Sequence, residues 1–516
     1  MSRFRLTLSI FVFTLFSTLS IAQTSSTVPI RYRHTEPTPN QIYGNVNLSA
    51  PLSSLRQGPP SSIDASYFVG PVVQPTSTTY EAESHIAMHI LNPSFLLAAI
   101  SDFSIPRFGF HTNTSKYAWS SDGGSTWAES FMELDQSSDQ APITGDGSRW
   151  QAMSDPVVAI DSINNIAYIS NLYFDIFDNK NGLYVGASPI QNGSVKFAAA
   201  ATRPVAVNTD PQTGLFEDKE WIAVDNSGKR KTSGNVYVAW VHYLDAAHQP
   251  FGGEIRVASS KDHAANFLPS VLVSPAAQVN AVQGPQIAVD HAGRVVVSWT
   301  YCLNYVVSQS QFNASCTQSQ VWGAVSSDGG ATFASPIPIS PVINDLDGSG
   351  FPSHYRKWSA PAMAVAPVGG EIAVVYIDQP GPTSVVEYVL CPAALEGACA
   401  APRTISDTNV GQRVLPAVAI DSLGFVHASW FDSRNAPSNP YSSQLDLYAA
   451  SATSPNKRFR SNVRVTTSTT DFDNSLKPKF IGDYTGIAAG WGIAHPAWTN
   501  GYMQTSTLVV SSAEKK

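Results

Sequence analysis

The sequence carries little charge and no long apolar run beyond its N-terminus, and each shortage excludes a class of protein. Only 14% of the 516 residues are charged, the net charge is −8, and no run of lysines and arginines occurs. A nucleic-acid partner is therefore not expected. No segment after the N-terminus is apolar for long enough to span a bilayer. The hydrophobic content of 43% is too high for a disordered chain, so a large folded protein is expected.

The first 22 residues have the pattern of a secretory signal peptide. Arg3 and Arg5 form a short basic region, residues 6–21 are almost wholly apolar, and Ser20 and Ala22 supply small residues before a cleavage site. The apolar run is shorter than the ~20 residues that a membrane-spanning helix needs. We therefore expect a secreted protein, extracellular or periplasmic, with no transmembrane segment after cleavage.

The four cysteines fall into two local pairs, Cys302 with Cys316 and Cys391 with Cys399. An even number of cysteines in an exported chain favours disulfides, although four cysteines allow three pairings. Neither pair has the C-x-x-C spacing or the nearby histidine that is typical of a zinc site. We therefore expect two local disulfides, no metal site and no cofactor.

One pattern recurs from about residue 81: an apolar strand, an Asp-x-x-Gly turn and a second strand that ends in Trp. The clearest copies run from Pro285 to Trp299 and from Pro416 to Trp430. Alternating strands joined by turn residues predict β-hairpins. With looser copies there are seven candidate inner strands, which begin near residues 84, 155, 220, 285, 360, 415 and 484.

A second motif follows several of these hairpins. Residues 120–127 and 326–333 match S-x-D-x-G-x-T-[WF], and residues 260–267 are a degraded copy. In such a turn, Ser and Asp side chains accept hydrogen bonds from backbone N–H groups and Gly adopts the positive φ. The motif resembles the Asp box of the BNR repeats in sialidase-like β-propellers.

This resemblance covers roughly residues 81–512 and implies an all-β fold, a propeller of six or seven four-stranded blades. Asp122, Asp262 and Asp328 would then hold turns and do no chemistry. Residues 23–80 are rich in Ser, Thr, Pro and Gln, and we expect them to form a leader or linker ahead of the propeller.

In a propeller, the loops that lead into the inner strands share one side with the loops that follow the second strands. Ligands usually bind over the central channel. Sialidases similarly bind a substrate carboxylate with three arginines, and they use an Asp as acid/base and a Tyr nucleophile activated by a Glu. The resemblance implies that Tyr484 is the nucleophile, with Glu220 or Glu217 as its base and Asp155 or Asp218 as the acid. The implied substrate-binding residues are Arg356, Trp358, Arg413, Arg434 and Asp483.

The sequence departs from the family in one respect. Sialidases carry an F/Y-R-I-P motif that supplies the first arginine, whereas here Ile105-Pro106-Arg107 has the wrong order. The resemblance therefore places Arg356, Arg413 and Arg434 on the ligand-binding face of the propeller, but it does not match them one by one to the three arginines of sialidases. The same charges would also serve as salt bridges, such as Arg434 with Asp432 or Lys219 with Glu220, which imply no function.

Three functions stay open on these residues. The first is a monomeric exo-glycosidase, similar to sialidases, that acts on an acidic carbohydrate or glycoconjugate. The second is a non-catalytic propeller that binds a glycan or a protein through the same face. The third is a polysaccharide lyase with His242 or His354 and a Tyr as base and acid.

Overall fold

The computed structural model of the protein describes residues 65–512 with gaps, of which the longest are 133–149 and 347–359. The expected signal peptide and residues 23–64 of the expected leader lie outside the described residues. Arg356, Trp358 and His354 also lie outside them.

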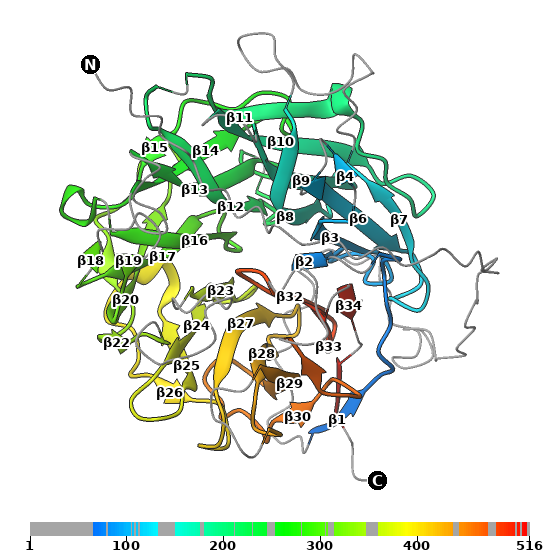
Figure 1. Ribbon diagram of the computed structural model, residues 1–516, viewed down its shortest axis with the longest axis vertical. Helices are drawn as coiled ribbons and strands as arrows, with labels where there is room; N and C mark the ends of the chain where they lie inside the picture. The colour runs from blue at the N-terminus through cyan, green and yellow to red at the C-terminus, as the bar shows by residue number, and fades with distance from the viewer. Residues whose placement is uncertain are drawn as a thin grey trace.

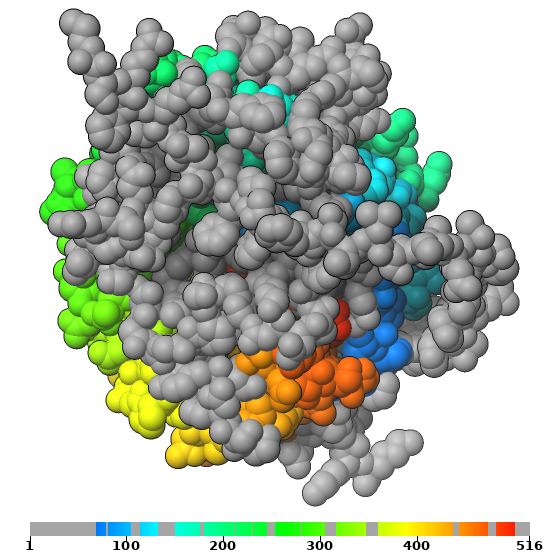
Figure 2. Space-filling model, in the orientation of Figure 1, coloured from blue at the N-terminus to red at the C-terminus, as the bar shows by residue number. Residues whose placement is uncertain are grey.

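Seven antiparallel sheets surround a common axis, and the innermost strand of each contacts that of the next (Figure 1). The chain order of the sheets can be followed by colour around the outer part of the molecule in Figure 2. Six sheets are each formed by one continuous segment. The seventh joins an N-terminal strand to the C-terminal strands and closes the ring. The expected all-β propeller is thus confirmed, with six contiguous blades and one composite closing blade.

Each of the first three sheets contains four strands, which follow one another in chain order from the axis outward. They are β2 (Glu81–Met88), β3 (Leu96–Asp102), β6 (Thr114–Ser120) and β7 (Ala128–Phe131); β8 (Ala152–Asp161), β9 (Ile166–Phe174), β10 (Asn181–Pro189) and β11 (Thr202–Asn208); and β12 (Phe216–Val224), β13 (Val236–Tyr243), β14 (Gly253–Ser260) and β15 (Val271–Leu272).

The next three sheets have the same order from the axis outward, and two of them carry an extra short strand. They are β16 (Val282–Val289), β17 (Val295–Cys302), β20 (Gln318–Ser326), β21 (Ile337–Pro338) and β22 (Ile343–Asn344); β23 (Ala362–Val365), β24 (Ile372–Asp378), β25 (Val385–Cys391) and β26 (Arg403–Thr404); and β27 (Arg413–Ile420), β28 (Val426–Asp432), β29 (Gln444–Ala452), β30 (Val463–Arg464) and β31 (Thr470–Asp471).

The closing sheet contains strands from both ends of the described chain, and the remaining elements are short. Its strands are β32 (Gly486–Gly490), β33 (Ile493–Thr499), β34 (Met503–Thr505), β35 (Leu508–Ser512) and β1 (Ala65–Val69). Two small hairpins, β4 (Pro106–Arg107) with β5 (Phe110–His111) and β18 (Val306–Val307) with β19 (Ala314–Ser315), and the 3-10 helices Ala199–Ala201, Ala276–Gln278 and Ala393–Leu395 complete the described elements.

The Asp-x-x-Gly pattern forms the turn between the first and second strands, as predicted. The carboxylate of Asp290 accepts hydrogen bonds from the backbone N–H groups of Ala292 (2.8 Å) and Arg294 (2.9 Å), and Gly293 has a φ of 78°. Asp421 accepts the equivalent bonds in its own blade. Each turn therefore satisfies the N–H groups that the hairpin leaves unpaired.

The tryptophans of the second strands form a repeated part of the core. Trp240, Trp299, Trp430 and Trp498 lie on β13, β17, β28 and β33, and each is fully buried. Four of the seven blades thus bury a large aromatic ring, which contributes several kcal/mol of burial free energy.

The three turn aspartates hold their turns between the third and fourth strands, as predicted. Asp122 accepts hydrogen bonds from the Thr126 backbone N–H (2.9 Å) and hydroxyl (2.6 Å), and Ser120 Oγ accepts one from the Gly124 N–H (2.9 Å). The same bonds recur around Asp262 and Asp328. Because the strands are antiparallel, these turns lie at the opposite end of the blades from the loops that lead into the inner strands.

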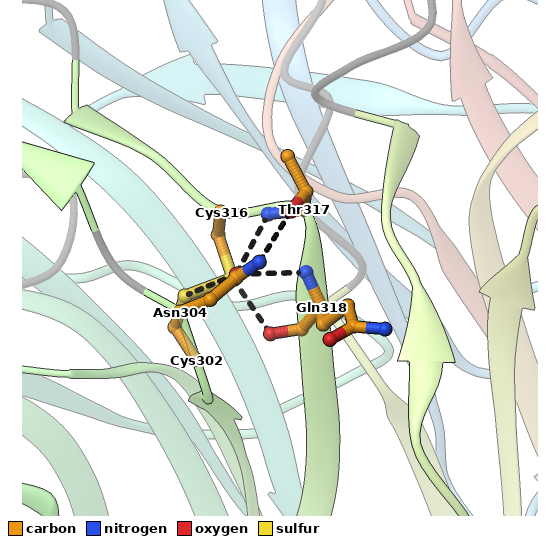
Figure 3. Close-up of a disulfide and its surroundings, with 5 residues drawn as sticks. All are labelled: Cys302, Asn304, Cys316, Thr317 and Gln318. Carbon is orange, nitrogen blue, oxygen red and sulfur yellow. Dashed lines mark hydrogen bonds between the residues drawn. A yellow bond between two sulfur atoms is a disulfide. The ribbon is translucent and has the colours of Figure 1, made fainter.

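Both expected disulfides are present, and each closes a loop within one blade. Cys302 bonds to Cys316 and Cys391 to Cys399, at sequence separations of 14 and 8. Beside the first, the side-chain oxygen of Asn304 accepts hydrogen bonds from the N–H groups of Thr317 (3.1 Å) and Gln318 (2.9 Å), so that the disulfide loop is also held by polar bonds (Figure 3).

Candidate functional site

A β-bulge near the start of the inner strand sets the geometry of the candidate site. The register between first and second strands shifts in five blades, and a residue in the left-handed region lies at each shift. These residues are Glu83, Asp155, Lys219, Gly284 and Leu415, with φ between 50° and 63°. Because a bulge redirects side chains, three consecutive blades bring a charged group toward the axis, whereas two later blades bring Gly and Leu.

Six charged residues form what we call the axial cluster: Glu83, Asp155, Asp218, Lys219, Glu220 and Asp483. They come from the first, second, third and closing blades, and all five carboxyl groups are buried. The Lys219 ammonium lies 2.6 Å from Asp483, 2.9 Å from Asp155 and 3.7 Å from Asp218. The structure therefore brings together predicted site residues from the second, third and closing blades.

Glu220 and Asp218 differ from the two carboxylates that Lys219 contacts most closely. Glu220 is 1% exposed, and its oxygens accept no hydrogen bond from the described residues. Burial and the charge of Asp155 raise the pKa of Glu220 well above its usual range. Burial also raises the pKa of Asp218 to about 6, even though Lys219 opposes the shift. The cluster thus contains carboxyl groups that favour the protonated form beside carboxylates that an ammonium stabilises.

Tyr484 lies against this cluster. Its hydroxyl donates a hydrogen bond to the backbone oxygen of Pro156 (3.0 Å), and its ring meets that of Trp221 edge to face at 5.5 Å. Burial raises the pKa of Tyr484 well above its usual range, and the charges of Glu83, Asp155, Glu220 and Asp483 add to that rise. The phenol therefore favours its neutral form, and its hydroxyl is bonded to a backbone oxygen.

A small cavity of about 20 Å³, with room for about one water molecule, opens beside Tyr484 and Asp483. Its other walls are mostly apolar and come from the fourth, fifth and sixth blades. They include Leu346, Pro361, Ile377, Leu415 and Pro416. The lining of this cavity thus combines an apolar wall on one side with the edge of the axial cluster on the other.

Arg413 does not take the substrate-binding position predicted for it. The side chain is fully buried, and its guanidinium donates to Asp432 (3.1 Å) and to the backbone oxygens of Ser384, Gly411, Thr408 and Val410 (2.8–3.0 Å). All five N–H donors are used within the fold, so none is left for a substrate carboxylate. The prediction was wrong because spacing indicates a face of the propeller but not the direction of a side chain.

Arg434 is also engaged by its own blade. Its guanidinium lies 2.7 Å from both Asp432 and Asp407 and packs 4.0 Å from the centre of the Tyr448 ring. The alternative prediction of an Arg434–Asp432 salt bridge is therefore confirmed. Lys219, by contrast, pairs with Asp155 and Asp483 in place of the expected Glu220.

Glu217, one of the two candidate bases, belongs to a separate pair. It accepts hydrogen bonds from Nδ1 of His242 (2.8 Å) and from the indole nitrogen of Trp240 (2.5 Å). Because a carboxylate accepts at Nδ1, the proton of a neutral His242 lies there and Nε2 carries the lone pair. This arrangement leaves Glu220 as the candidate carboxyl group in the axial cluster.

Sequence reasoning missed Glu83 and Lys219 as members of the site. Their left-handed backbone is not marked in the sequence by a Gly or Asn. The signal that would find them is their position: each stands two residues before the residue at which the inner strand resumes its pairing, at the place that Asp155 occupies in the second blade.

Three carboxylates of the cluster lie close enough together to surround one metal ion. One oxygen each of Glu83, Asp155 and Asp483 lies within 4.8 Å of the others. Two of these carboxylates contact the Lys219 ammonium, which supplies positive charge at the same place, so we do not assign them as metal ligands. Within the described part of the chain, none of the helices has the length and apolar character needed to cross a membrane.

No protein-family model and no curated protein matches the chain. Among solved structures, it is similar to the α-L-arabinofuranosidase of Fusarium graminearum, at 14% identity over 71% of this chain and 93% of that chain, with a TM-score of 0.44. It is also similar to the α-L-arabinanase of Penicillium chrysogenum (15%, 79% and 99%, TM-score 0.43) and to the sialidase of Trypanosoma rangeli (9%, 73% and 57%, TM-score 0.42). The fold assignment rests on the strand pairing described above.

Proposed function

We propose that the protein is a secreted exo-glycosidase whose reacting groups lie in the axial cluster. The observation that carries the proposal is the position of Tyr484, whose hydroxyl is bonded to Pro156, the residue directly after Asp155. Glycosidases combine a protonated carboxyl group that donates to the leaving oxygen with a base or nucleophile in its ionised state. Here Glu220 is buried without a side-chain hydrogen-bond partner among the described residues, and Asp155 is paired with Lys219, so we assign the first role to Glu220 and the second to Asp155.

The charge of the groups reverses two of the roles that the sequence suggested. Asp155 is the base that takes the phenolic proton while Tyr484 attacks the anomeric carbon. Glu220 is the acid that gives its proton to the departing oxygen. In the second step, the Glu220 carboxylate deprotonates a water molecule, which displaces Tyr484, and the phenol regains its proton from Asp155.

The sugar that this site favours is neutral. The cluster holds five carboxyl groups and one ammonium, and the guanidinium of Arg413 is used within the fold. A sugar carboxylate beside Tyr484 would meet the like charge of Asp483, where burial strengthens repulsion. The acidic-sugar preference expected from sialidases would depend on Arg356, which lies outside the described residues.

The test is a set of variants assayed on glycosides with good and poor leaving groups. Tyr484→Phe should lose at least about a thousandfold in kcat. Glu220→Gln should lose about 10²–10⁴-fold on alkyl glycosides but little on dinitrophenyl glycosides, which need no acid. Equal losses on both leaving groups would remove Glu220 from the acid role, and full turnover by Tyr484→Phe would remove the nucleophile. A wild type that binds a sugar but hydrolyses none would make the protein a carbohydrate-binding propeller.

A further inference from the structure

Lys219 has a backbone conformation that side chains rarely adopt. Its φ is 57°, in the left-handed region, and the bulge around it interrupts the register between Asp218 and Trp221. A non-glycine residue in this region costs on the order of 1 kcal/mol or more, and such residues gather at functional sites. The bulge thus costs conformational free energy, and it directs the Lys219 side chain, which is 13% exposed, into a group of carboxyl groups.

The ammonium of Lys219 links carboxylates from three blades. It contacts Asp483 of the closing blade (2.6 Å), Asp155 of the second blade (2.9 Å) and Asp218 of its own blade (3.7 Å). Burial lowers the pKa of Lys219, but the charges of Asp155, Asp218, Asp483 and Glu83 outweigh that effect and raise it well above its usual range. This shift favours the charged form of the side chain.

The contacts of Lys219 divide the carboxyl groups into two sets. Asp155 and Asp483 lie within hydrogen-bonding distance of the ammonium. Glu220, the next residue in the chain, makes no contact with it within 4 Å and is buried without a hydrogen-bond partner among the described residues. In a medium of low dielectric, a contact of this kind decides which of two neighbouring acids keeps its proton.

We infer that Lys219 is a positioning residue that holds Asp155 and Asp483 in their ionised form and so leaves Glu220 as the protonated acid. This inference rests on the proposed function, because it assigns the base and the acid of that reaction. The titratable groups that face Lys219 are Glu83, Asp155, Asp218, Glu220, Asp483 and Tyr484.

The first experiment is the pH profile of kcat/KM for wild type, Lys219→Met and Lys219→Arg. Without the ammonium, Asp155 and Asp483 lose the positive charge that lies between them, so protonation of the base becomes more favourable. The acidic limb of Lys219→Met should therefore move upward by at least about one pH unit, so that kcat/KM falls by about tenfold at pH values below the wild-type limb and is unchanged well above both limbs. Lys219→Arg should keep the wild-type limb. Lys229→Met, at an exposed lysine, is the matched control.

An unmoved acidic limb in folded Lys219→Met would overturn the inference even if total activity fell, because a purely structural role lowers activity equally at every pH. If wild type hydrolyses no glycoside, the proposed function fails, and urea unfolding then tests the charge assignment alone. Relative to wild type, Lys219→Met should gain stability as the pH falls from 8 to 5, since its freed carboxyls take up protons in the folded state. A parallel pH dependence would overturn it.

Discussion

Replacement of Arg413 by Met distinguishes a structural arginine from a substrate-binding one. The change removes an ion pair with the fully buried Asp432 and hydrogen bonds to four backbone oxygens. Breaking one side of a buried ion pair typically costs about 3–5 kcal/mol. Part of that cost is offset because Arg434 still binds Asp432 at 2.7 Å, while the orphaned backbone oxygens add to it. We expect the free energy of unfolding to fall by about 4 kcal/mol.

The assay is urea unfolding followed by tryptophan fluorescence, since Trp430 donates to the same Asp432 from within the affected blade. Arg203→Met is the control, because that guanidinium bonds only the exposed oxygen of Ala200 and the partly buried one of Thr202. The control should change stability by less than about 1 kcal/mol. If Arg413→Met were no more destabilising than Arg203→Met, and instead weakened binding of an acidic sugar, the assignment of Arg413 to the fold would be refuted.

Two further predictions concern the disulfides and the dependence of stability on pH. On the chain-entropy estimate, loss of the Cys302–Cys316 bond through paired alanine substitutions should cost about 3 kcal/mol of unfolding free energy, and loss of Cys391–Cys399 about 2.5 kcal/mol, because the second loop is shorter. Denaturant midpoints measured with and without reductant show which variant is less stable. Equal midpoints for the two variants would contradict the prediction. Burial raises the pKa of Asp218 to about 6, above its unfolded value, so its contribution to stability is complete below about pH 4 and is lost as the pH rises through 6. Asp218→Asn should therefore be more stable relative to wild type at pH 8 than at pH 5, whereas a difference that is constant with pH would show that Asp218 carries no such shift.

The repeated hairpins could be predicted because their signals are local. An aspartate that caps a turn and a tryptophan in the strand that follows it are read directly from the sequence, and Asp290 and Trp299 lie where that pattern placed them. The two disulfides follow from the same short-range logic, since each cysteine pair is close in sequence.

The candidate site could be predicted only in part, because it depends on where side chains from distant blades point. Asp155, Asp218, Glu220 and Asp483 were assigned to the correct end of the blades, since antiparallel topology fixes that end. The bulge that turns Lys219 toward them shifts one strand against its neighbour and leaves no mark in the pattern of apolar residues. Arg413 stands at the position in its blade where a substrate-binding arginine is expected. Most of its hydrogen-bond partners are backbone oxygens, and because every residue has one, the sequence does not reveal them.

The closing blade also has a consequence for how the protein reaches its native state. Strand β1 pairs with β35, so that Ala65 lies opposite Ser512 and the ring is completed by segments at opposite ends of the described chain (Figure 1). Contacts of such high sequence separation form late, because the intervening chain must first lose its conformational entropy. Before β35 has been added, β1 and part of the outer edge of β33 lack their partner in the closing sheet. Until β35 docks, those edges are exposed to pairing with other chains, and a chaperone that shields them would raise the yield of folded protein.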